Sequence, residues 1–554
     1  MQPTGRPAWR GYADPRLVND LIAEQAMQTA DQTRITYVDD QGVPTSVWTL
    51  TDLHERARRH AGAMLASGVT AGDRVLIMVG NHPEFLPAFL GTLYLGAVAV
   101  PVNTAMRGRS LGGLLRDADP SYALVDSAHQ SELFEQSDES VRTTLRGVWT
   151  LGPSDDAMTA EWALPLGEDP DRASPYEGSM IRPPEELAAL MYTSGTTGGP
   201  KGVMVSHQML YAWAQATQFN IGYNPDDVAF ACLPLFHSNA LVCTFLASVL
   251  GGADVVIAPR FSASNYWTQI HRSGATATNL LGTMGQILWQ REVSALEQQH
   301  QLSRMMLVPS PPASRYEAFE RRFNVKLTEL YGLTDSGIPL AVPHEQRRPG
   351  SCGVPTPGWR CAIVDDQDVP VNDGDVGELV LRPQVPFIGM SGYWNRPEDT
   401  VAAWRNLWFH TGDFVRRDSD GWFYFVGRKK QMIRRGGENI SPSEVETAVL
   451  SDPHVMDAAA YAVADDVMGE EVMVAVVPEK DKTIDPRSLI RRCAADLPAF
   501  AVPRYIRFVD ELPKTSTEKT TVSALQAQGV TDDSIDMGTR KSATDFRIDG
   551  GRAT

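Results

Sequence analysis

The chain has 554 residues, of which 43% are hydrophobic and 21% charged. This composition is typical of a globular enzyme, and a chain of this length is too long for one ordinary core, so we expect two or three domains. The 50 basic and 68 acidic residues give a formal net charge of −18, which argues against general nucleic-acid binding because that function needs a basic face.

The five cysteines form no CxxC pair and are odd in number. This usage favours buried thiols in a reducing cytoplasm over a disulfide framework or a zinc site. The N-terminal residues contain no apolar stretch, and no apolar run approaches the roughly 18 residues that a membrane span needs. We therefore expect a cytoplasmic protein without a membrane span.

The first part of the chain alternates helical and extended patterns. Thr51 is the expected N-cap of a helix over residues 52–65, whose apolar residues recur at helical spacing. Strands separated by helices predict a parallel α/β layer. The expected strands of this layer cover residues 74–79, 97–101 and 121–126, before a surface connection over 152–184.

Residues 192–207 place glycines, hydroxyls and one lysine between two apolar segments that we expect to be strands. Glycines let backbone N–H groups turn toward one anion, the hydroxyls add donors, and Lys201 supplies a charge. Lys201 follows a proline and lies between strands, so the spacing is not that of a Walker loop. We interpret the stretch as a phosphate-binding loop, the alternative being a flexible surface loop.

Further strands follow. We expect a helix to about residue 219, an apolar strand over 228–239 that ends in polar groups, and an apolar strand from 275 that breaks at Gly282. Functional groups gather where such strands end. A strand over 254–258, a helix from 264 and a small β subdomain around 361–382 complete this part.

The last part of the chain, from residue 428, has the pattern of a small α+β domain. We expect its polar tail, residues 534–554, to be frayed. The expected elements are helices over 443–450 and 486–496 and strands over 455–463, 472–477 and 505–509.

Several polar residues lie in patterns that suit a nucleotide. The ring of Tyr331 suits stacking on a nucleobase, Asp335 suits a divalent cation that bridges phosphates, and Asp413 suits the two hydroxyls of a ribose. Taken alone, Tyr331 and Asp413 have ordinary alternatives, a strand-end turn and a surface turn. His237, which follows an apolar strand and stands beside Phe236, could likewise be a packing residue. The basic residues over 428–435 would ordinarily be a solvated face.

Together these stretches resemble the motifs of the adenylate-forming superfamily, which includes acyl-CoA synthetases, peptide-synthetase adenylation domains and beetle luciferases. The resemblance covers about residues 17–525, with the motifs in the family's order. It implies an α/β fold with a large N-terminal domain, residues 1–427, of two α/β subdomains plus a β subdomain. A small mobile α+β domain, residues 428–554, would follow. The chain looks most similar to crotonobetaine/carnitine-CoA ligase-like enzymes.

The resemblance implies a two-step reaction. ATP, with Mg²⁺, and a small or medium carboxylic acid give an acyl-adenylate, and the thiol of CoA then takes the acyl group. One alternative is an adenylating enzyme that uses a carrier protein, an amine or nitrite. Another is a binding protein without catalysis. We expect no nucleic-acid partner, and the oligomeric state stays open, with a homodimer among the options.

The resemblance also implies roles for individual residues. The catalytic residues would be Lys519, His237, Thr334 and Asp335, with Asp335 and Thr196 at the metal. ATP or AMP would contact Thr193, Ser194, Gly195, Thr196, Thr197, Lys201, Tyr331, Gly332, Asp413 and Arg428. Lys430 would be the hinge, and Gly436, Gly437 and Glu438 the loop that serves the acceptor. The acyl pocket would draw on His237, Asn239, Gly282, Met284, Ser336 and Gly337.

The chain departs from the family's pattern at several positions. Asp335 stands where glutamate is usual, Gln431 where aspartate is usual, and Glu518 where glycine is usual. The turn over residues 308–313 carries three prolines in place of glycines, where the backbone normally lies against adenine and the acyl group. Substrate choice therefore does not carry over from relatives.

Overall fold

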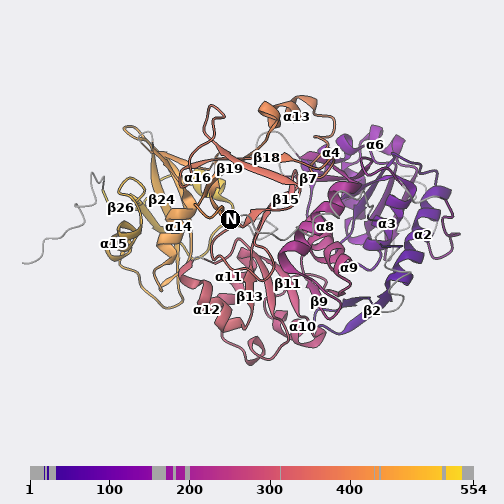
Figure 1. The fold of residues 1–554 in the computed structure, drawn as a ribbon, viewed down its shortest axis with the longest axis horizontal. Helices are drawn as coiled ribbons and strands as arrows, with labels where there is room; N and C mark the ends of the chain where they lie inside the picture. Colours follow the sequence, from indigo (N-terminus) through magenta and orange to yellow (C-terminus); the bar gives the residue numbers. More distant parts are fainter. Residues whose placement is uncertain are drawn as a thin grey trace, which may run out of the picture.

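The computed structural model describes residues 18, 22–23, 33–152, 170–178, 182–193, 200–311, 313–429, 431–435, 438–514 and 520–538. Figure 1 shows a broad body built from the first three quarters of the chain and a smaller α+β domain, coloured orange to yellow, at one end. Within the described ranges, no helix is both long and apolar enough to cross a bilayer.

The first α/β layer is a six-stranded sheet in the order β6-β5-β3-β4-β7-β8. All neighbours are parallel except β7 and β8. Its strands are β3 (Arg74–Met78), β4 (Val98–Pro101), β5 (Tyr122–Asp126), β6 (Gly147–Leu151), β7 (Leu187–Thr193) and β8 (Lys201–Ser206). Its helices are α2 (Leu50–Ala66), α3 (Phe85–Leu95), α4 (Gly108–Ala118), η2 (Ser127–His129), α5 (Gln130–Gln136) and α6 (Glu139–Thr144).

The second layer is a seven-stranded sheet in the order β13-β12-β11-β9-β10-β1-β2, parallel apart from the β1–β2 hairpin. Its strands are β1 (Arg34–Val38), β2 (Pro44–Thr49), β9 (Val228–Ala231), β10 (Asp254–Ile257), β11 (Ala277–Leu281), β12 (Arg304–Val308) and β13 (Lys326–Thr328). Its helices are α8 (His207–Ile221), η3 (Asn239–Leu246), α9 (Ala247–Gly251), α10 (Tyr266–Ser273), α11 (Gly282–Gln290), η4 (Ala295–Glu297) and α12 (Ala313–Phe323). Helix α8 contacts both layers, and one apolar core runs through them.

A β subdomain follows, as predicted, and all its strand pairs are antiparallel. It has a three-stranded sheet of β14 (Leu330–Leu333), β15 (Gly337–Ala341) and β16 (Val354–Pro355). A four-stranded sheet contains β17 (Trp359–Val364), β18 (Val376–Pro383), β19 (Phe409–Arg417) and β20 (Phe423–Arg428). The short helices α13 (Pro397–Ala403) and η5 (Arg405–Leu407) lie between β18 and β19 in the chain.

The smaller domain, called the lid below, is a six-stranded sheet with an apolar cluster on each face. Its strands are β21 (Ile433–Arg435), β22 (Glu438–Ile440), β23 (Val455–Asp465), β24 (Gly469–Pro478), β25 (Tyr505–Phe508) and β26 (Ile535–Asp536). Its helices are α14 (Pro442–Leu450), α15 (Pro486–Asp496) and α16 (Val522–Gln528). The helices and strands predicted between residues 443 and 509 are thereby confirmed.

Three sequence predictions about elements are wrong. The start of the tail that we expected to be frayed is ordered, because Ile535 and Asp536 form β26, which pairs with β25. The N-cap of α2 is Thr49, not Thr51: its hydroxyl accepts from Asp52 N, and Asp52 Oδ2 accepts from Thr49 N at 2.8 Å. This reciprocal capping box places Leu50, which is buried, inside the helix.

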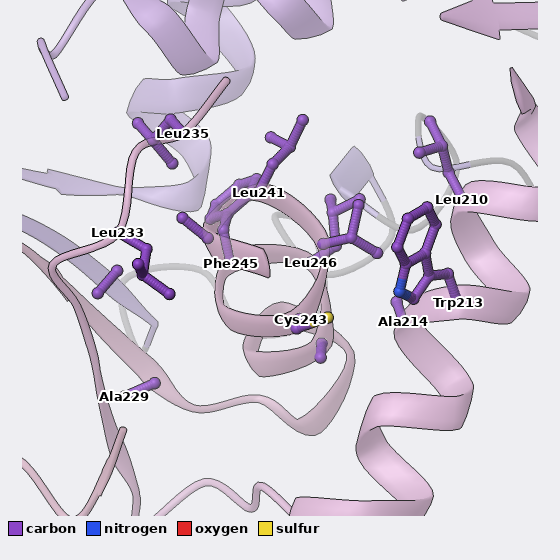
Figure 2. Close-up of a cluster of buried hydrophobic side chains, with 14 of the residues drawn as sticks. Leu210, Trp213, Ala214, Ala229, Leu233, Leu235, Leu241, Cys243, Phe245 and Leu246 are labelled. Carbon is purple, nitrogen blue, oxygen red and sulfur yellow. The ribbon is translucent and has the colours of Figure 1, made fainter. Parts of the chain in front are cut away.

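The strand predicted over residues 228–239 ends at Ala231. The side chain of Asn81 holds the next segment out of the sheet, because it donates to Leu233 O and accepts from Leu235 N. The segment then enters η3, a π-helix, and Figure 2 shows Cys243 and Leu246 of this helix on the side toward Trp213 of α8, within a cluster of buried hydrophobic side chains. Wide π turns are frequent near functional sites.

Candidate active site

The predicted phosphate loop joins β7 to β8. Thr193 on β7 is paired with Lys201 on β8 in antiparallel register, so the two strands predicted on either side of the loop are confirmed. Ser194, Gly195, Thr196 and Thr197 lie outside the described residues.

Lys201 has two neighbours that the sequence did not predict. Its Nζ lies 3.1 Å from Asp399 Oδ2 and 5.2 Å from the ring centre of Tyr393. Tyr393 reaches this position because its backbone bridges to Val203 on β8. The ammonium is thus held by an acid and an aromatic face, and a phosphate that binds Lys201 competes with Asp399 for it.

Asp335 lies in the turn between β14 and β15, two residues before Gly337. Its Oδ1 accepts a hydrogen bond of 2.5 Å from the hydroxyl of Tyr393. Burial raises the pKa of Asp335, while this hydrogen bond and the charges of Lys201 and Arg428 lower it. These neighbours offset only part of the rise in pKa that burial causes. A bound cation or further hydrogen-bond donors would therefore stabilise the charged carboxylate.

Asp413 lies on β19, beside Arg428 on β20. The hydroxyl of Tyr331 donates to Asp413 Oδ2 at 2.6 Å, and Arg428 Nε lies 3.4 Å from Asp413 Oδ1. Burial raises the pKa of Asp413, and the charge of Asp335 adds to this rise. Because Arg428 lowers the pKa of both aspartates, the two carboxylates belong to one electrostatic site.

Five of the residues predicted for this site therefore come together in the structure: Lys201, Tyr331, Asp335, Asp413 and Arg428. Gly332 is exposed, and a Cβ on it would lie 2.7 Å from Gly337 O. The hairpin formed by β14 and β15 thus needs a glycine at this position to keep its two strands close. Thr334 is half-buried in the same hairpin turn.

The residues predicted for the acyl pocket are more dispersed. A shallow pocket is lined by Ser336 and Gly337 together with Trp213 of α8 and Thr356. His237 is exposed at the edge of the Phe236 ring, and Asn239 is the first residue of η3. No described donor reaches the buried Oδ1 of Asn239. Neither His237 nor Asn239 lines the pocket.

The proline-rich turn packs against the start of α11. A Cβ on Gly282 would lie 2.6 Å from Pro309 O and 2.9 Å from Pro309 Cδ, so residue 282 must be glycine for this approach. Met284 is buried two residues further along α11. Hydrogen bonds from Ser310 in this turn lower the pKa of Glu329, but burial has the larger effect and raises it to about 7.

Several predicted residues of the lid cannot be placed. Lys430, Gly436, Gly437 and Lys519 lie outside the described residues. Glu438 begins β22, and its side chain is not described.

Sequence reasoning missed Tyr393, Asp399 and Glu329. The two residues that contact Lys201 reach it through pairing between β8 and a segment of the β subdomain, which leaves no local pattern in the sequence. Glu329 could have been identified from the sequence, because it is an acid that stands two residues before Tyr331 in a segment with apolar edges.

The fold is that of a large α/β domain followed by a small α+β domain, and the contacts above bring charged and aromatic residues of the predicted site together. Comparison with protein families agrees. Residues 22–394 match the model of the AMP-binding enzyme family, and residues 444–519 match that of the AMP-binding enzyme C-terminal domain. The chain therefore belongs to the AMP-binding enzyme family.

Individual relatives extend this comparison over nearly the whole chain. A sulfoacetate–CoA ligase from Cupriavidus necator is 33% identical over 90% of this chain and 95% of the relative. A crotonobetaine/carnitine–CoA ligase from Salmonella paratyphi C is 28% identical over 88% of this chain and 95% of the relative. Among solved structures, ATP-bound MatB from Rhodopseudomonas palustris is similar with a TM-score of 0.79 and 26% identity, over 93% of this chain and 99% of that one.

Proposed function

We propose that the protein is an ATP-dependent, AMP-forming ligase that joins a small or medium carboxylic acid to CoA. The observation that carries the proposal is a pair of poorly solvated carboxylates, Asp335 and Asp413. Each accepts a hydrogen bond from a tyrosine hydroxyl, and the charge of Arg428 lowers the pKa of both. Such a site suits the ribose and phosphates of a nucleotide. The CoA ligases among the relatives support the reaction.

In this proposal Asp413 accepts hydrogen bonds from the ribose hydroxyls, and Tyr331 lies against adenine while it orients Asp413. Arg428 contacts ribose or phosphate. Lys201, with Thr193 and the loop over 194–197, holds the phosphates that leave. This assignment is supported by the Tyr331–Asp413–Arg428 contacts and by the pairing of Thr193 with Lys201.

The residues present fit a Mg²⁺ ion at Asp335. Burial raises the pKa of the Asp335 carboxyl more than its neighbours lower it, so a cation would stabilise the charged form. The described residues contain no group of three or more acids, histidines or cysteines that could hold a metal by themselves. Asp335, with Thr196 as predicted, would hold the ion together with phosphate and water oxygens. When bound, Mg²⁺ would neutralise charge on the phosphates.

The proposed reaction has two displacements. A carboxylate oxygen of the acid attacks the α-phosphorus of ATP, and pyrophosphate leaves with the electrons of the broken P–O bond. The thiolate of CoA then attacks the acyl carbon, and AMP leaves. Lys519 would stabilise charge in the first step, and rotation of the lid about Lys430 would bring residues 436–438 to the site for the second.

The acyl group would lie among His237, Asn239, Gly282, Met284, Ser336 and Gly337, with Thr334 near the phosphates. The relatives named above suggest small acids, some of them charged. We also propose a boundary between the two domains after residue 427. A homodimer and a cytoplasmic location stay predictions, to be tested by light scattering and by fractionation of the source cells.

The test is release of AMP and pyrophosphate across a panel of acids, each with and without CoA. The panel includes sulfoacetate, crotonobetaine, benzoate and nitrite. We expect AMP to accumulate only when an acid and CoA are both present. Accumulation of AMP without CoA would favour the alternative of another acceptor. Pyrophosphate release with nitrite would favour activation of this oxyacid instead of a carboxylic acid. No release of AMP or pyrophosphate with any acid would contradict the proposal.

A further inference from the structure

A segment of the β subdomain, residues 390–399, lies between two parts of the candidate active site, and we call it the bridging segment. On one side Trp394 N donates to Gly202 O of β8 at 2.8 Å, and on the other Met390 N donates to Asp335 O at 3.0 Å. These backbone hydrogen bonds join the strand that begins at Lys201 to the turn that carries Asp335.

The bridging segment is also fixed to the first α/β layer. The indole N–H of Trp394 donates to Asp117 O at 3.0 Å, and the hydroxyl of Tyr192 on β7 donates to Asp117 Oδ2 at 2.7 Å. Asp117 of α4 thus holds both the bridging segment and the strand that pairs with β8. Because three separate elements contribute to these bonds, movement of the segment away from Lys201 would break them.

The first turn of α13 places the side chain of Asp399. The hydroxyl of Thr400 accepts a hydrogen bond of 2.9 Å from Tyr393 N and donates one of 3.0 Å to Arg396 O. Thr400 therefore ties the start of the helix to the backbone of Tyr393. As a result Asp399, from the helix, and Tyr393, from the preceding turn, reach the same ammonium group.

Lys201 and Asp399 form an ion pair that a ligand can reach. Lys201 Nζ and Asp399 Oδ2 lie 3.1 Å apart, and the two side chains are 25% and 40% exposed. An ion pair with this exposure is held weakly, because water screens the charges and both side chains lose conformational freedom when they pair. A phosphate group, which carries more negative charge than a carboxylate, can therefore displace Asp399 from Lys201.

Tyr393 has a different role from Asp399, although its ring also lies against Lys201. Its hydroxyl donates to Asp335 Oδ1. Burial raises the pKa of Tyr393, and the negative charges of Asp335 and Asp399 raise it further, so the hydroxyl stays protonated and remains a donor. Tyr393 thus serves Asp335, whereas Asp399 supplies the negative charge that the bridging segment places on Lys201.

We propose that Asp399 is an internal competitor for Lys201: its carboxylate weakens the binding of pyrophosphate and thereby speeds the release of this product. The proposal rests on the proposed function, because it takes Lys201 as a group that holds the phosphates that leave. Asp399 is a positioning residue, since it acts on the product through Lys201. Removal of its charge should therefore tighten binding, a result that local damage to the site would not give.

Calorimetric titration with magnesium pyrophosphate tests the proposal without any turnover. Asp399→Asn removes the charge and keeps the size of the side chain, and Glu398→Gln, at the neighbouring exposed acid of the same helical turn, is the matched control. We expect Asp399→Asn to lower the dissociation constant of pyrophosphate about two- to fivefold, as for loss of an exposed ion pair, and the gain to shrink at high salt. Glu398→Gln should change the constant clearly less.

Three calorimetric results would overturn the proposal. They are unchanged or weaker binding in Asp399→Asn, an equal gain in both variants, and no binding of pyrophosphate by the parent chain.

Product inhibition connects the ion pair with the reaction. AMP formation is measured at rising pyrophosphate concentration in the parent, in Asp399→Asn and in Asp399→Glu, which keeps the negative charge. Pyrophosphate should inhibit Asp399→Asn at about two- to fivefold lower concentration than the parent, and Asp399→Glu should return toward the parent value. Equal inhibition of the parent and Asp399→Asn would contradict the proposal. If no acid yields AMP, the proposed function fails, yet the calorimetric comparison still decides whether Asp399 opposes pyrophosphate binding.

Discussion

The two aspartates of the candidate site, Asp335 and Asp413, each accept a hydrogen bond from a tyrosine hydroxyl. The tyrosine fixes one carboxylate oxygen in each case, and the other oxygen of Asp413 lies 3.4 Å from Arg428 Nε. Because the hydrogen bond favours the charged form, it also offsets part of the rise in pKa that burial causes. Tyr331 and Tyr393 thus favour the charged form of the two acids and orient it.

Removal of the Tyr331 hydroxyl tests whether this hydrogen bond orients Asp413 and favours its charged form. We expect Tyr331→Phe to raise the KM for ATP by about two- to tenfold, as for the loss of one hydrogen bond, and to change kcat less. Since the hydroxyl lowers the pKa of Asp413, its loss should also move the acid limb of the kcat/KM profile to higher pH. Steady-state AMP formation at varied ATP and pH measures both.

Tyr424→Phe is the matched control, because Tyr424 donates to Asp418 at 2.9 Å outside the candidate site. Its KM for ATP should stay within about twofold of the parent value, the spread expected for a surface substitution. The same increase in both variants, or an unshifted acid limb in Tyr331→Phe, would contradict the role given to Tyr331.

The raised pKa of Glu329 predicts how the free energy of unfolding depends on pH. Its pKa in the folded chain is about 7, above the ordinary value of 4.5, because of burial. The folded chain binds this proton more tightly, so the group's contribution to the free energy of unfolding is complete below pH 4.5 and is lost as pH rises through 7. Glu329→Gln should therefore gain stability relative to the parent by about 1–3 kcal/mol between mildly acidic and mildly alkaline pH. Denaturant titrations across that range measure it.

Glu317→Gln serves as the control for that experiment, since Glu317 is an exposed acid nearby on α12. Its stability difference from the parent should not change with pH. A constant difference for Glu329→Gln as well would show that Glu329 is ionised at little cost in the folded chain.

At the scale of elements, the start of α2 gives a direct test of the capping box. We expect Thr49→Ala to lower the free energy of unfolding by about 1 kcal/mol, as for loss of an N-cap. Thr51→Ala removes a hydroxyl inside the first turn and should cost clearly less. Denaturant midpoints of the two variants compare them, and a larger cost for Thr51→Ala would mean that the helix begins later.

Much of the element order could be predicted from local patterns. The strand expected over residues 74–79 is β3, and the helix expected over 486–496 is α15. The end of β9 could not be predicted, because it depends on Asn81, which is far away in the chain. The side chain of Asn81 forms hydrogen bonds with the backbone of Leu233 and Leu235. Apolar periodicity contains no information about such a long-range bond.

The same division holds for the site. Lys201, Tyr331, Asp335 and Asp413 each lie in a motif, and the sequence identified them one by one. Tyr393 and Asp399 could not be found, since they reach Lys201 only through the pairing of β8 with the β subdomain. Motifs therefore predicted the candidate ligand-binding groups, whereas tertiary contacts supply the groups that hold them.

At the scale of the whole molecule, the two domains share the proposed work. The large domain carries the two aspartates that accept hydrogen bonds from tyrosine hydroxyls, and the lid carries Lys519, the lysine proposed for the first step. A reaction with two unlike steps is consistent with this division, because one site must first hold ATP and an acid and then admit a thiol. The central claim is that the acid is activated by bonding to AMP.

Transfer of a heavy oxygen isotope tests that claim most directly. The acid is labelled in both carboxylate oxygens, the full reaction is run with ATP and CoA, and the products are weighed by mass spectrometry. If the carboxylate attacks the α-phosphorus and the thiol later cleaves the acyl C–O bond, AMP must carry one labelled oxygen and pyrophosphate none. Unlabelled AMP, or label in a free phosphate released with ADP, would contradict the account.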